Sequence, residues 1–283
     1  MAYGDYPNLS QVKRVLVVKL RHLGDVLLTT PLFSALKKAL PSAEIDAYIY
    51  KEGCALLENH PAISKIHVYD RSWKKERLSR RLFREAKLLK QIRDCSYDLV
   101  INLTEGDRGA LAARFSGAKI RVGIDKRKIY THMAKNCPSL RHTVERQLDV
   151  LRRIGIFPSQ EERELFLAIP ESARESITRR LPWSRFILIH PTSRWRFKCI
   201  SVQTMRLVAQ RLVEQGEKLV FTSGNDPAEC SMIEEIVQGL PSESFCSLAG
   251  AITIQELGAL IESCAALLCV DSLPFHMASA LKA

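Results

Sequence analysis

Short apolar runs alternate along the chain with longer segments of helical periodicity. The runs are rich in β-branched residues, and they fall at residues 14–20, 44–50, 65–69, 98–103, 119–124, 185–190, 218–222 and 266–270. The first of them, RVLVVKL, is almost unbroken, as expected for a strand that is buried on both faces of a parallel sheet. The alternation therefore predicts an α/β fold with parallel sheets.

Helical patterns separate the apolar runs. The clearest covers residues 73–93 and carries many Lys and Arg on its polar side. Between Phe157 and Pro182 the chain has three prolines and a charged cluster, which is typical of a connection between domains. We therefore expect two similar Rossmann-like lobes, over residues 1–160 and 184–283, joined by a connection over residues 161–183.

The end of the sequence is unusual for such a fold. The last twelve residues, SLPFHMASALKA, begin a helical pattern where the sequence stops. A parallel sheet that finished on so short a helix would leave one edge poorly covered. We therefore expect the C-terminal lobe to be truncated.

Composition and charge restrict the possible partners. The 283 residues are 46% hydrophobic and 26% charged, which is typical of a globular protein, and the net charge is +11. This charge predicts an anionic partner, whether nucleic acid, an anionic membrane surface or a phosphorylated substrate. No apolar run could cross a bilayer, and the first residues lack the features of a secretory signal, so we expect a cytoplasmic protein.

The cysteines show no metal-binding or disulfide pattern. They are scattered at positions 54, 95, 137, 199, 230, 246, 264 and 269, with no C-x-x-C pair. We expect reduced thiols and no structural zinc site.

An acidic residue follows the first predicted strand. The segment KLRHLGD at 19–25 places Asp25 just after this strand, and ligands of open α/β sheets bind beyond the carboxyl ends of the strands. Thr30 and Pro31 then favour the start of the main helix, so Asp25 is expected on the turn that leads into it. From these residues alone, a plain helix-start role is favoured for Asp25 over a functional one, and the dinucleotide-binding G-x-G-x-x-G pattern is absent.

A basic loop follows the first strand of the second half. Its hydroxyls and cations, in the segment HPTSRWRFK, are Thr192, Ser193, Arg194, Arg196 and Lys198. Together with the backbone amides of a following helix, they could bind a diphosphate. An exposed loop that caps the next helix would show the same residues.

Two further turns carry acids and hydroxyls. VDSLPFH at 270–276 places Asp271, Ser272 and His276 between a strand and a helix, where the residues alone favour a simple N-cap role for Ser272. The turn SGNDPAE carries Glu229. No G-x-S-x-G, H-E-x-x-H or P-loop pattern is present, which disfavours hydrolase, metalloprotease and P-loop functions.

Taken together, these segments resemble glycosyltransferase family 9, the ADP-heptose:lipopolysaccharide heptosyltransferases. The resemblance begins at about Arg14, where VLVVKLRHLGDVLLTTPLFSALKKALPSAEID is similar to the opening of that family. It continues through RHTVERQLDVLRRIGI, the basic loop, LAGAITIQEL and VDSLPFH to the last residue. Within the family, the chain is most similar to members that add a branch heptose to the second inner-core heptose. It departs at Leu273, where many relatives have Gly, which affects the donor contacts expected there.

The resemblance implies a GT-B fold, with an acceptor-binding lobe followed by a nucleotide-sugar-binding lobe. It also implies inversion at the anomeric carbon, with Asp25 as the general base. Donor-binding roles are implied for Thr192, Ser193, Lys198, Glu229, Asp271, Ser272 and His276, and more weakly for Arg194 and Arg196. ADP-heptose is the implied donor, and neither a metal nor a cofactor is expected.

The implied acceptor explains the positive charge. It is a phosphorylated lipid A-core on the inner leaflet of the cytoplasmic membrane, and basic residues would attract the enzyme to that surface. The acceptor-side candidates are Lys74, Lys75, Arg77, Arg121, His142 and Arg146. Other GT-B transferases or epimerases and an inactive truncated heptosyltransferase remain alternatives. A nucleic-acid-binding protein is disfavoured, because few aromatic residues accompany the basic clusters.

Overall fold

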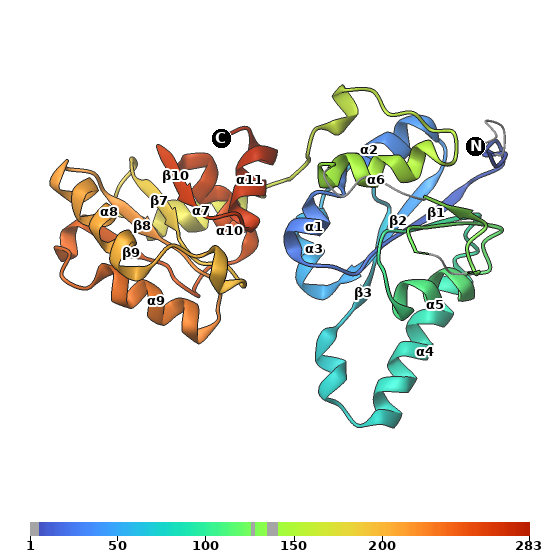
Figure 1. Ribbon diagram of the computed structural model, residues 1–283, viewed down its shortest axis with the longest axis horizontal. Coiled ribbons are helices and arrows are strands. Elements are labelled where there is room, and N and C mark those ends of the chain that lie inside the picture. The colour runs from blue at the N-terminus through green and yellow to red at the C-terminus, as the bar shows by residue number, and fades with distance from the viewer. Residues whose placement is uncertain (1–5, 126–127, 135–140) are drawn as a thin grey trace. The chain divides into compact units, whose positions relative to one another are not determined.

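The computed structural model describes residues 6–125, 128–134 and 141–283. The chain divides into two compact units, Met1–Phe166 and Leu167–Ala283, and each contains its own parallel sheet with helices packed around it (Figure 1). The parallel α/β architecture predicted from the sequence is therefore confirmed.

The N-terminal unit is built on six parallel strands in the order β3-β2-β1-β4-β5-β6. The strands are β1 (Arg14–Lys19), β2 (Glu44–Tyr50), β3 (Lys65–Tyr69), β4 (Leu99–Asn102), β5 (Ile120–Gly123) and β6 (His132–Met133). The central strand β1 has no exposed surface from Val15 to Val18. This burial on both faces explains why its sequence is uniformly apolar.

Helices cover both faces of this sheet. They are α1 (Leu23–Leu27), α2 (Thr30–Ala39), α3 (Cys54–Leu57), α4 (Leu78–Asp94), α5 (Asp107–Phe115) and α6 (Thr143–Arg152), with short 3-10 turns η1 (Lys51–Gly53), η2 (Arg71–Lys75) and η3 (Glu161–Arg163). The helices α4 and α5 pack on Leu16, Val18 and Val100, while α2 and α6 lie together on the other side (Figure 1).

The helix predicted over residues 73–93 begins later in the structure. Residues Arg71–Lys75 form the 3-10 turn η2, in which the Asp70 carboxylate accepts a hydrogen bond from the Ser72 amide. The α-helix starts only at Leu78. The prediction of its first residues was therefore wrong, because the Asx cap at Asp70 stabilises a separate turn before the helix.

The C-terminal unit is built on four parallel strands in the order β10-β7-β8-β9. The strands are β7 (Ile187–His190), β8 (Leu219–Phe221), β9 (Phe245–Ser247) and β10 (Ala266–Cys269). The helices are α7 (Glu171–Arg180), α8 (Val202–Glu214), α9 (Pro227–Val237), α10 (Ile254–Ser263) and α11 (Leu273–Leu281), with 3-10 turns η4 (Arg196–Lys198) and η5 (Ser242–Ser244). Ile189, Leu219 and Phe221 pack with Met205 and Ile233 in its core.

The stretch expected as a connection contains ordered structure of the C-terminal unit. Helix α7 lies within it and packs against α10, where Ser176 donates a hydrogen bond to Glu256 at 2.6 Å. The Arg174 guanidinium lies 2.8 Å from the Glu262 carboxylate. The boundary between the compact units falls between Phe166 and Leu167, near the start of that stretch.

Candidate functional site

Each sheet has one place at which the order of its strands reverses. It lies between β1 and β4 in the N-terminal unit and between β10 and β7 in the C-terminal unit. Loops that leave neighbouring strands at such a point diverge and open a crevice beyond the carboxyl ends of the strands. Asp25 follows β1, the basic loop at 190–198 follows β7, and the segment 270–276 follows β10. The main predicted site residues therefore lie at the reversal point of their own sheets.

Asp25 lies on a short helix of its own. The turn expected before the main helix forms the five-residue helix α1, and α2 then begins at Thr30. The main-chain oxygen of Asp25 accepts a hydrogen bond from the Thr29 hydroxyl at 2.8 Å. Its carboxylate is half-buried and accepts no hydrogen bond from any residue that the structure describes, so it is available to a ligand.

A buried lysine accompanies Asp25. Lys19 is the last residue of β1 and is only 6% exposed. Burial lowers the pKa of its ammonium group to about 8; the Asp25 charge opposes this shift, whereas the charges of Arg21 and Arg146 add to it. Lys19 was not among the predicted site residues, although a cation inside an otherwise apolar strand was the available signal. One of the acceptor-side candidates, Arg146, therefore lies within electrostatic reach of the same site.

The basic loop after β7 begins inside the protein. Its first hydroxyl, that of Thr192, is fully buried and donates a hydrogen bond to the Glu229 carboxylate at 2.8 Å. The Gly224 amide donates to the same carboxylate at 2.9 Å. Thr192 therefore holds Glu229 in place, and Ser193 and Lys198 are the more accessible members of the predicted diphosphate-binding set.

An ion pair joins the loops after β7 and β10. The Lys198 ammonium lies 2.5 Å from the Asp271 carboxylate and 3.4 Å from the main-chain oxygen of Asp271. The hydrogen bond from Lys198 lowers the pKa of Asp271, and the charge of His276 contributes to the same shift. His276 lies on the first turn of α11, where we expected it. The structure thus gathers Lys198, Asp271 and His276 at one end of the sheet.

The other predicted residues near these loops have different roles. Ser272 is the N-cap residue of α11, but its hydroxyl donates to the Val270 carbonyl and not to the helix. Arg194 and Arg196 are exposed on the loop.

The acceptor-side candidates fall into two groups. Lys74, Lys75 and Arg77 are exposed, and none of them forms an ion pair with a residue that the structure describes. In contrast, the Arg121 guanidinium donates to the carbonyls of Ile129 and Ala118, at 2.7 and 2.5 Å. His142 accepts a hydrogen bond from the Val144 amide as the cap of α6. The sequence pattern did not distinguish these structural contacts from ligand binding.

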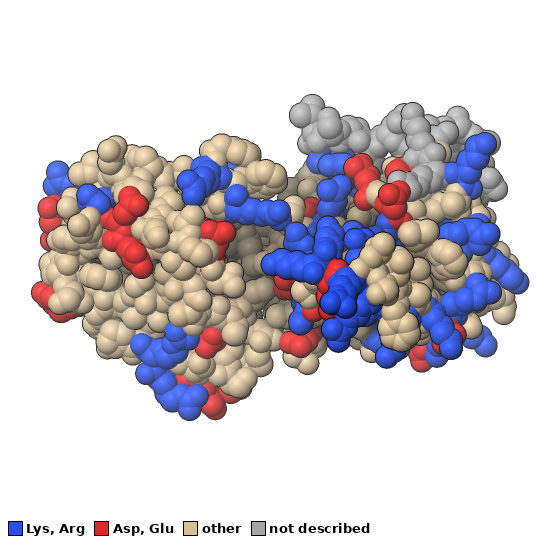
Figure 2. Space-filling model, turned by 90° about the horizontal axis from the view of Figure 1, so that it is seen from below, with Lys and Arg blue, Asp and Glu red and all other residues tan. Residues whose placement is uncertain are grey.

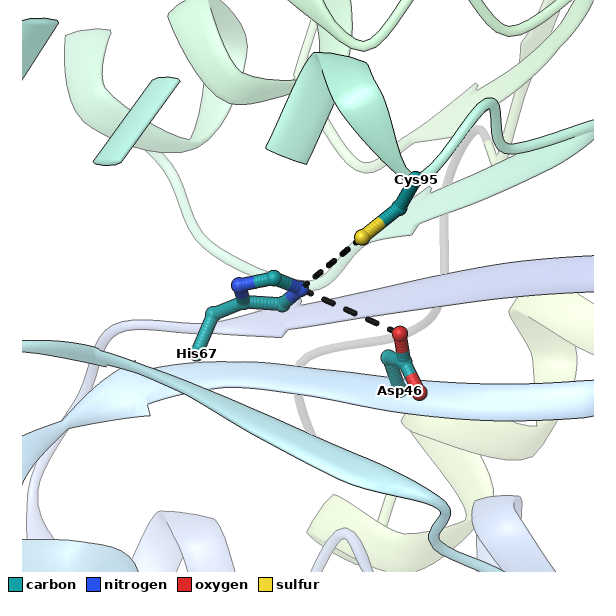
Figure 3. Close-up of side chains that lie close together, drawn as sticks. All are labelled: Asp46, His67 and Cys95. Atoms are coloured by element: carbon teal, nitrogen blue, oxygen red, sulfur yellow. Dashed lines mark hydrogen bonds and ion pairs between the residues drawn. The ribbon is translucent and has the colours of Figure 1, made fainter. Parts of the chain in front are cut away.

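A second polar cluster lies inside the N-terminal unit (Figure 3). Asp46 on β2, His67 on β3 and Cys95 after α4 point toward one another, with His67 Nε2 3.8 Å from the Asp46 carboxylate and 3.9 Å from Cys95 Sγ. These residue types could bind a metal. Asp46 and His67 lie within their strands and Cys95 lies before β4, whereas the residues discussed above follow the carboxyl ends of the strands.

The hydroxyl of Tyr97 completes this cluster. It donates to Asp46 at 2.5 Å and lies 2.7 Å from His67 Nε2. Burial raises the pKa of Tyr97, and the hydrogen bond to Asp46 raises it further, so the hydroxyl keeps its proton. These hydrogen bonds account for the burial of the polar side chains, and we assign the cluster a structural role.

The thiols of the described part of the chain are free. They are Cys54, Cys95, Cys199, Cys230, Cys246, Cys264 and Cys269, all half-buried, while Cys137 lies outside the described residues. Burial raises the pKa of Cys54, Cys246, Cys264 and Cys269. None of the helices in residues 6–125, 128–134 and 141–283 has the length and apolar character that a membrane span requires.

Comparisons with known proteins agree with this architecture. Residues 85–283 match Glycosyltransferase family 9 (heptosyltransferase). The chain is 31% identical to lipopolysaccharide heptosyltransferase 3 of Escherichia coli over 274 residues, which cover 93% of this chain and 79% of that protein. A second E. coli protein of that name is 33% identical over 276 residues, or 93% and 78% of the two chains.

A solved structure shows the same fold. The glycosyl transferase family 9 protein from Veillonella parvula superposes with a TM-score of 0.84 at 24% identity, covering 98% of this chain and 80% of that one. The expected GT-B fold, with two Rossmann-like units, is confirmed, and so is the expectation of a glycosyltransferase. This chain belongs to glycosyltransferase family 9, the heptosyltransferase family.

Proposed function

We propose that this protein is an inverting heptosyltransferase of the lipopolysaccharide core. It transfers L-glycero-D-manno-heptose from ADP-heptose to an inner-core heptose. The observation that carries the proposal is the family match over most of the chain together with an available carboxylate, Asp25, at the reversal point of the first sheet. The E. coli relatives are named lipopolysaccharide heptosyltransferase 3, and a solved E. coli heptosyltransferase, WaaC, contains ADP-2-deoxy-2-fluoro heptose.

Asp25 acts as the general base in this reaction. Its carboxylate takes the proton from the acceptor hydroxyl as the hydroxyl oxygen attacks the anomeric carbon, and the bond from that carbon to ADP breaks on the opposite side. Because the carboxylate accepts no hydrogen bond from the described residues, its lone pairs are free for this proton. A positioned base of this kind contributes about 10²–10⁴-fold to the rate.

The loops after β7 and β10 bind the departing ADP. Lys198, Ser193 and His276 supply positive charge and hydrogen-bond donors to the diphosphate, whose charge grows as the bond breaks. Asp271 orients Lys198 through their ion pair and contacts the donor heptose. Glu229, held by Thr192, binds the ribose. Fixed cations supply the charge that a metal would otherwise provide, so the proposal includes no metal or cofactor.

The acceptor is a phosphorylated lipid A-core at the cytoplasmic face of the inner membrane. Lys74, Lys75 and Arg77 are exposed without acidic partners among the described residues, so they are available to its phosphates. Arg146 lies closer to the reaction, since its charge acts on Lys19 beside Asp25. The protein is therefore proposed to be cytoplasmic and peripheral to the membrane.

The test is transfer from ADP-heptose to a truncated core acceptor. We expect Asp25→Asn to lower kcat by about 10²-fold or more while the Kd for ADP stays within about twofold of the wild-type value. Glu44→Gln, at the opposite edge of the same sheet, is the control and keeps wild-type activity. Undiminished turnover in Asp25→Asn would remove the assigned base. Protection from thermal unfolding by UDP-sugars but not by ADP-sugars would exclude the heptose donor.

A further inference from the structure

Helix α4 carries one apolar stripe, of which only the C-terminal part is buried. Leu78, Leu82, Leu89 and Ile92 follow one another at intervals of four, seven and three residues and so share one side of the helix. Ile92 is fully buried and Leu89 packs against the core, but Leu78 is 67% exposed and Leu82 is 54% exposed. Phe83, adjacent in sequence, is 69% exposed. Three large apolar side chains are therefore exposed on the first two turns.

A polar network lies between the buried and the exposed parts of the apolar stripe. The Glu85 carboxylate accepts hydrogen bonds from the Tyr69 hydroxyl at 2.6 Å and from Arg81 at 3.1 Å. The Arg108 guanidinium lies 4.6 Å from the centre of the Tyr69 ring. Residues before Glu85 lie beyond this network, and Figure 1 shows η2 and the start of α4 projecting past the sheet. The exposed leucines thus have no core to pack against.

The same segment carries most of the net charge of the protein. Residues 71–94 contain ten Lys or Arg and three Asp or Glu, a balance of +7, whereas the whole chain has +11. Figure 2 views the molecule from the projecting end of α4 and shows Lys and Arg gathered over this part of the N-terminal unit. Exposed apolar side chains are thus surrounded by cations, which is the pattern of helices that lie in the interface of an anionic membrane.

We propose that the start of α4 is a membrane-docking element. Leu78, Leu82 and Phe83 insert among the lipid headgroups of an anionic phospholipid bilayer, and the cations of α4 (Leu78–Asp94) bind the lipid phosphates. The proposal builds on the lipid-linked acceptor of the proposed function, but its ligand is the phospholipid surface and not the glycolipid. Each Lys or Arg near such a surface raises the partition coefficient by about fivefold, and the apolar side chains add a second, salt-insensitive contribution.

Vesicle flotation without any glycolipid tests the docking. We expect the protein to bind vesicles that contain phosphatidylglycerol more tightly than vesicles of phosphatidylcholine alone, and less tightly as NaCl is raised. The triple variant Leu78→Ser/Leu82→Ser/Phe83→Ser is expected to bind the anionic vesicles at least about tenfold more weakly. The control is Leu207→Ser, since Leu207 is 63% exposed on α8, outside this segment.

Insertion itself is measured by fluorescence. Brominated phosphatidylglycerol is expected to quench a tryptophan introduced as Phe83→Trp, beyond the quenching of the wild-type protein, but not one introduced as Leu207→Trp. If the triple variant bound anionic vesicles as tightly as the wild type, the proposal would be overturned, because the charges alone would then account for the binding. Binding that required the glycolipid acceptor would also overturn it, and would assign this surface to the acceptor.

Different variants test the membrane docking and the proposed heptosyl transfer, so that one proposal can fail without the other. With a water-soluble acceptor the triple variant is expected to keep its kcat, since none of the three side chains is assigned to the reaction, and to keep its thermal unfolding temperature, since all three are exposed. Asp25→Asn is expected to lose transfer but to bind vesicles like the wild type. Loss of soluble-acceptor transfer in a folded triple variant would overturn the assignment of these residues to docking alone.

Discussion

The ammonium group of Lys198 lies 2.5 Å from the carboxylate of Asp271, although 73 residues separate them in sequence. Their side chains are 32% and 65% exposed, and pairs as exposed as this contribute only about 0–1 kcal/mol to stability. The pair joins the loops after two neighbouring parallel strands, β7 and β10. The ion pair therefore fixes the position of the Lys198 side chain. We expect this to affect ligand binding more than the stability of the fold.

We predict that Lys198→Met lowers the affinity for ADP by about tenfold or more, because a charge-assisted hydrogen bond to the diphosphate is lost. The free energy of unfolding is expected to change by less than about 1 kcal/mol. Calorimetric titration and urea unfolding measure the two quantities. Arg185→Met is the matched control, since Arg185 forms an ion pair of the same length with Glu217 just before β7. Equal ADP affinities for all three proteins would contradict the prediction.

A substitution at Lys19 is predicted to stabilise the fold. The pKa of this buried ammonium group falls from the ordinary 10.5 to about 8, so it carries its charge at about pH 7 at a cost on the order of 3 kcal/mol. We expect Lys19→Met to raise the free energy of unfolding by about 1–3 kcal/mol near pH 7.

The gain in unfolding free energy from Lys19→Met is expected to become smaller as the pH rises. Between about pH 8 and 10.5 the unfolded wild-type chain binds more protons than the folded one, so the stability of the wild type increases across this range. Urea unfolding near pH 7 and near pH 10 measures the difference, with Lys13→Met as an exposed control. A gain that is the same at both pH values would rule out burial of the charge as its cause.

Removal of the Tyr97 hydroxyl is predicted to destabilise the protein. Tyr97→Phe leaves the buried Asp46 carboxylate without its hydrogen-bond donor at 2.5 Å, which costs about 2–3 kcal/mol. Tyr50→Phe is the control, with an expected change under about 0.5 kcal/mol, because its hydroxyl makes no hydrogen bond to the described residues. A Tm that rises when Zn²⁺ is added, and no longer rises in Cys95→Ser, would instead show a metal site.

His190 is predicted to make the protein sensitive to mild acid. Burial lowers the pKa of its imidazole from 6.5 to about 4, so the ring is neutral in the folded protein and protonates first in the unfolded chain. Stability therefore falls as the pH drops from about 6.5 toward 4, by up to about 3 kcal/mol. His190→Asn removes this titration, and the pH dependence of its unfolding free energy is expected to be shallower than that of the wild type. If the unfolding free energies of the wild type and His190→Asn depended on pH in the same way, the lowered pKa of His190 would be contradicted.

Sequence patterns predicted the strands well wherever burial was strong. The eight apolar runs correspond to strands, and the pattern is clearest in β1, where Val15 to Val18 are buried on both faces of the sheet. The pattern missed β6 and β9, which have only two and three residues, too few to form a recognisable run. It also placed the start of the long helix too early, since the Asp70 cap was not recognised.

The positions of the site residues were predicted more easily than their partners. Asp25, Lys198 and Asp271 stand out because each follows an apolar run, and the carboxyl ends of parallel strands share one edge. That Thr192 holds Glu229 depends on the order of strands in the sheet, which no local pattern specifies. The same holds for Arg121, whose hydrogen bonds to two carbonyls follow from the packing around β5.

The division of α4 into an anchored half and a projecting half has a practical consequence. Leu88 and Ile92 hold the helix to the sheet, so the first two turns can be redesigned without disturbing the core. A version with polar residues at Leu78, Leu82 and Phe83 would be easier to purify without detergent. Adding those side chains back singly would then show how recruitment to a surface changes the rate at which a soluble enzyme finds a lipid-bound substrate.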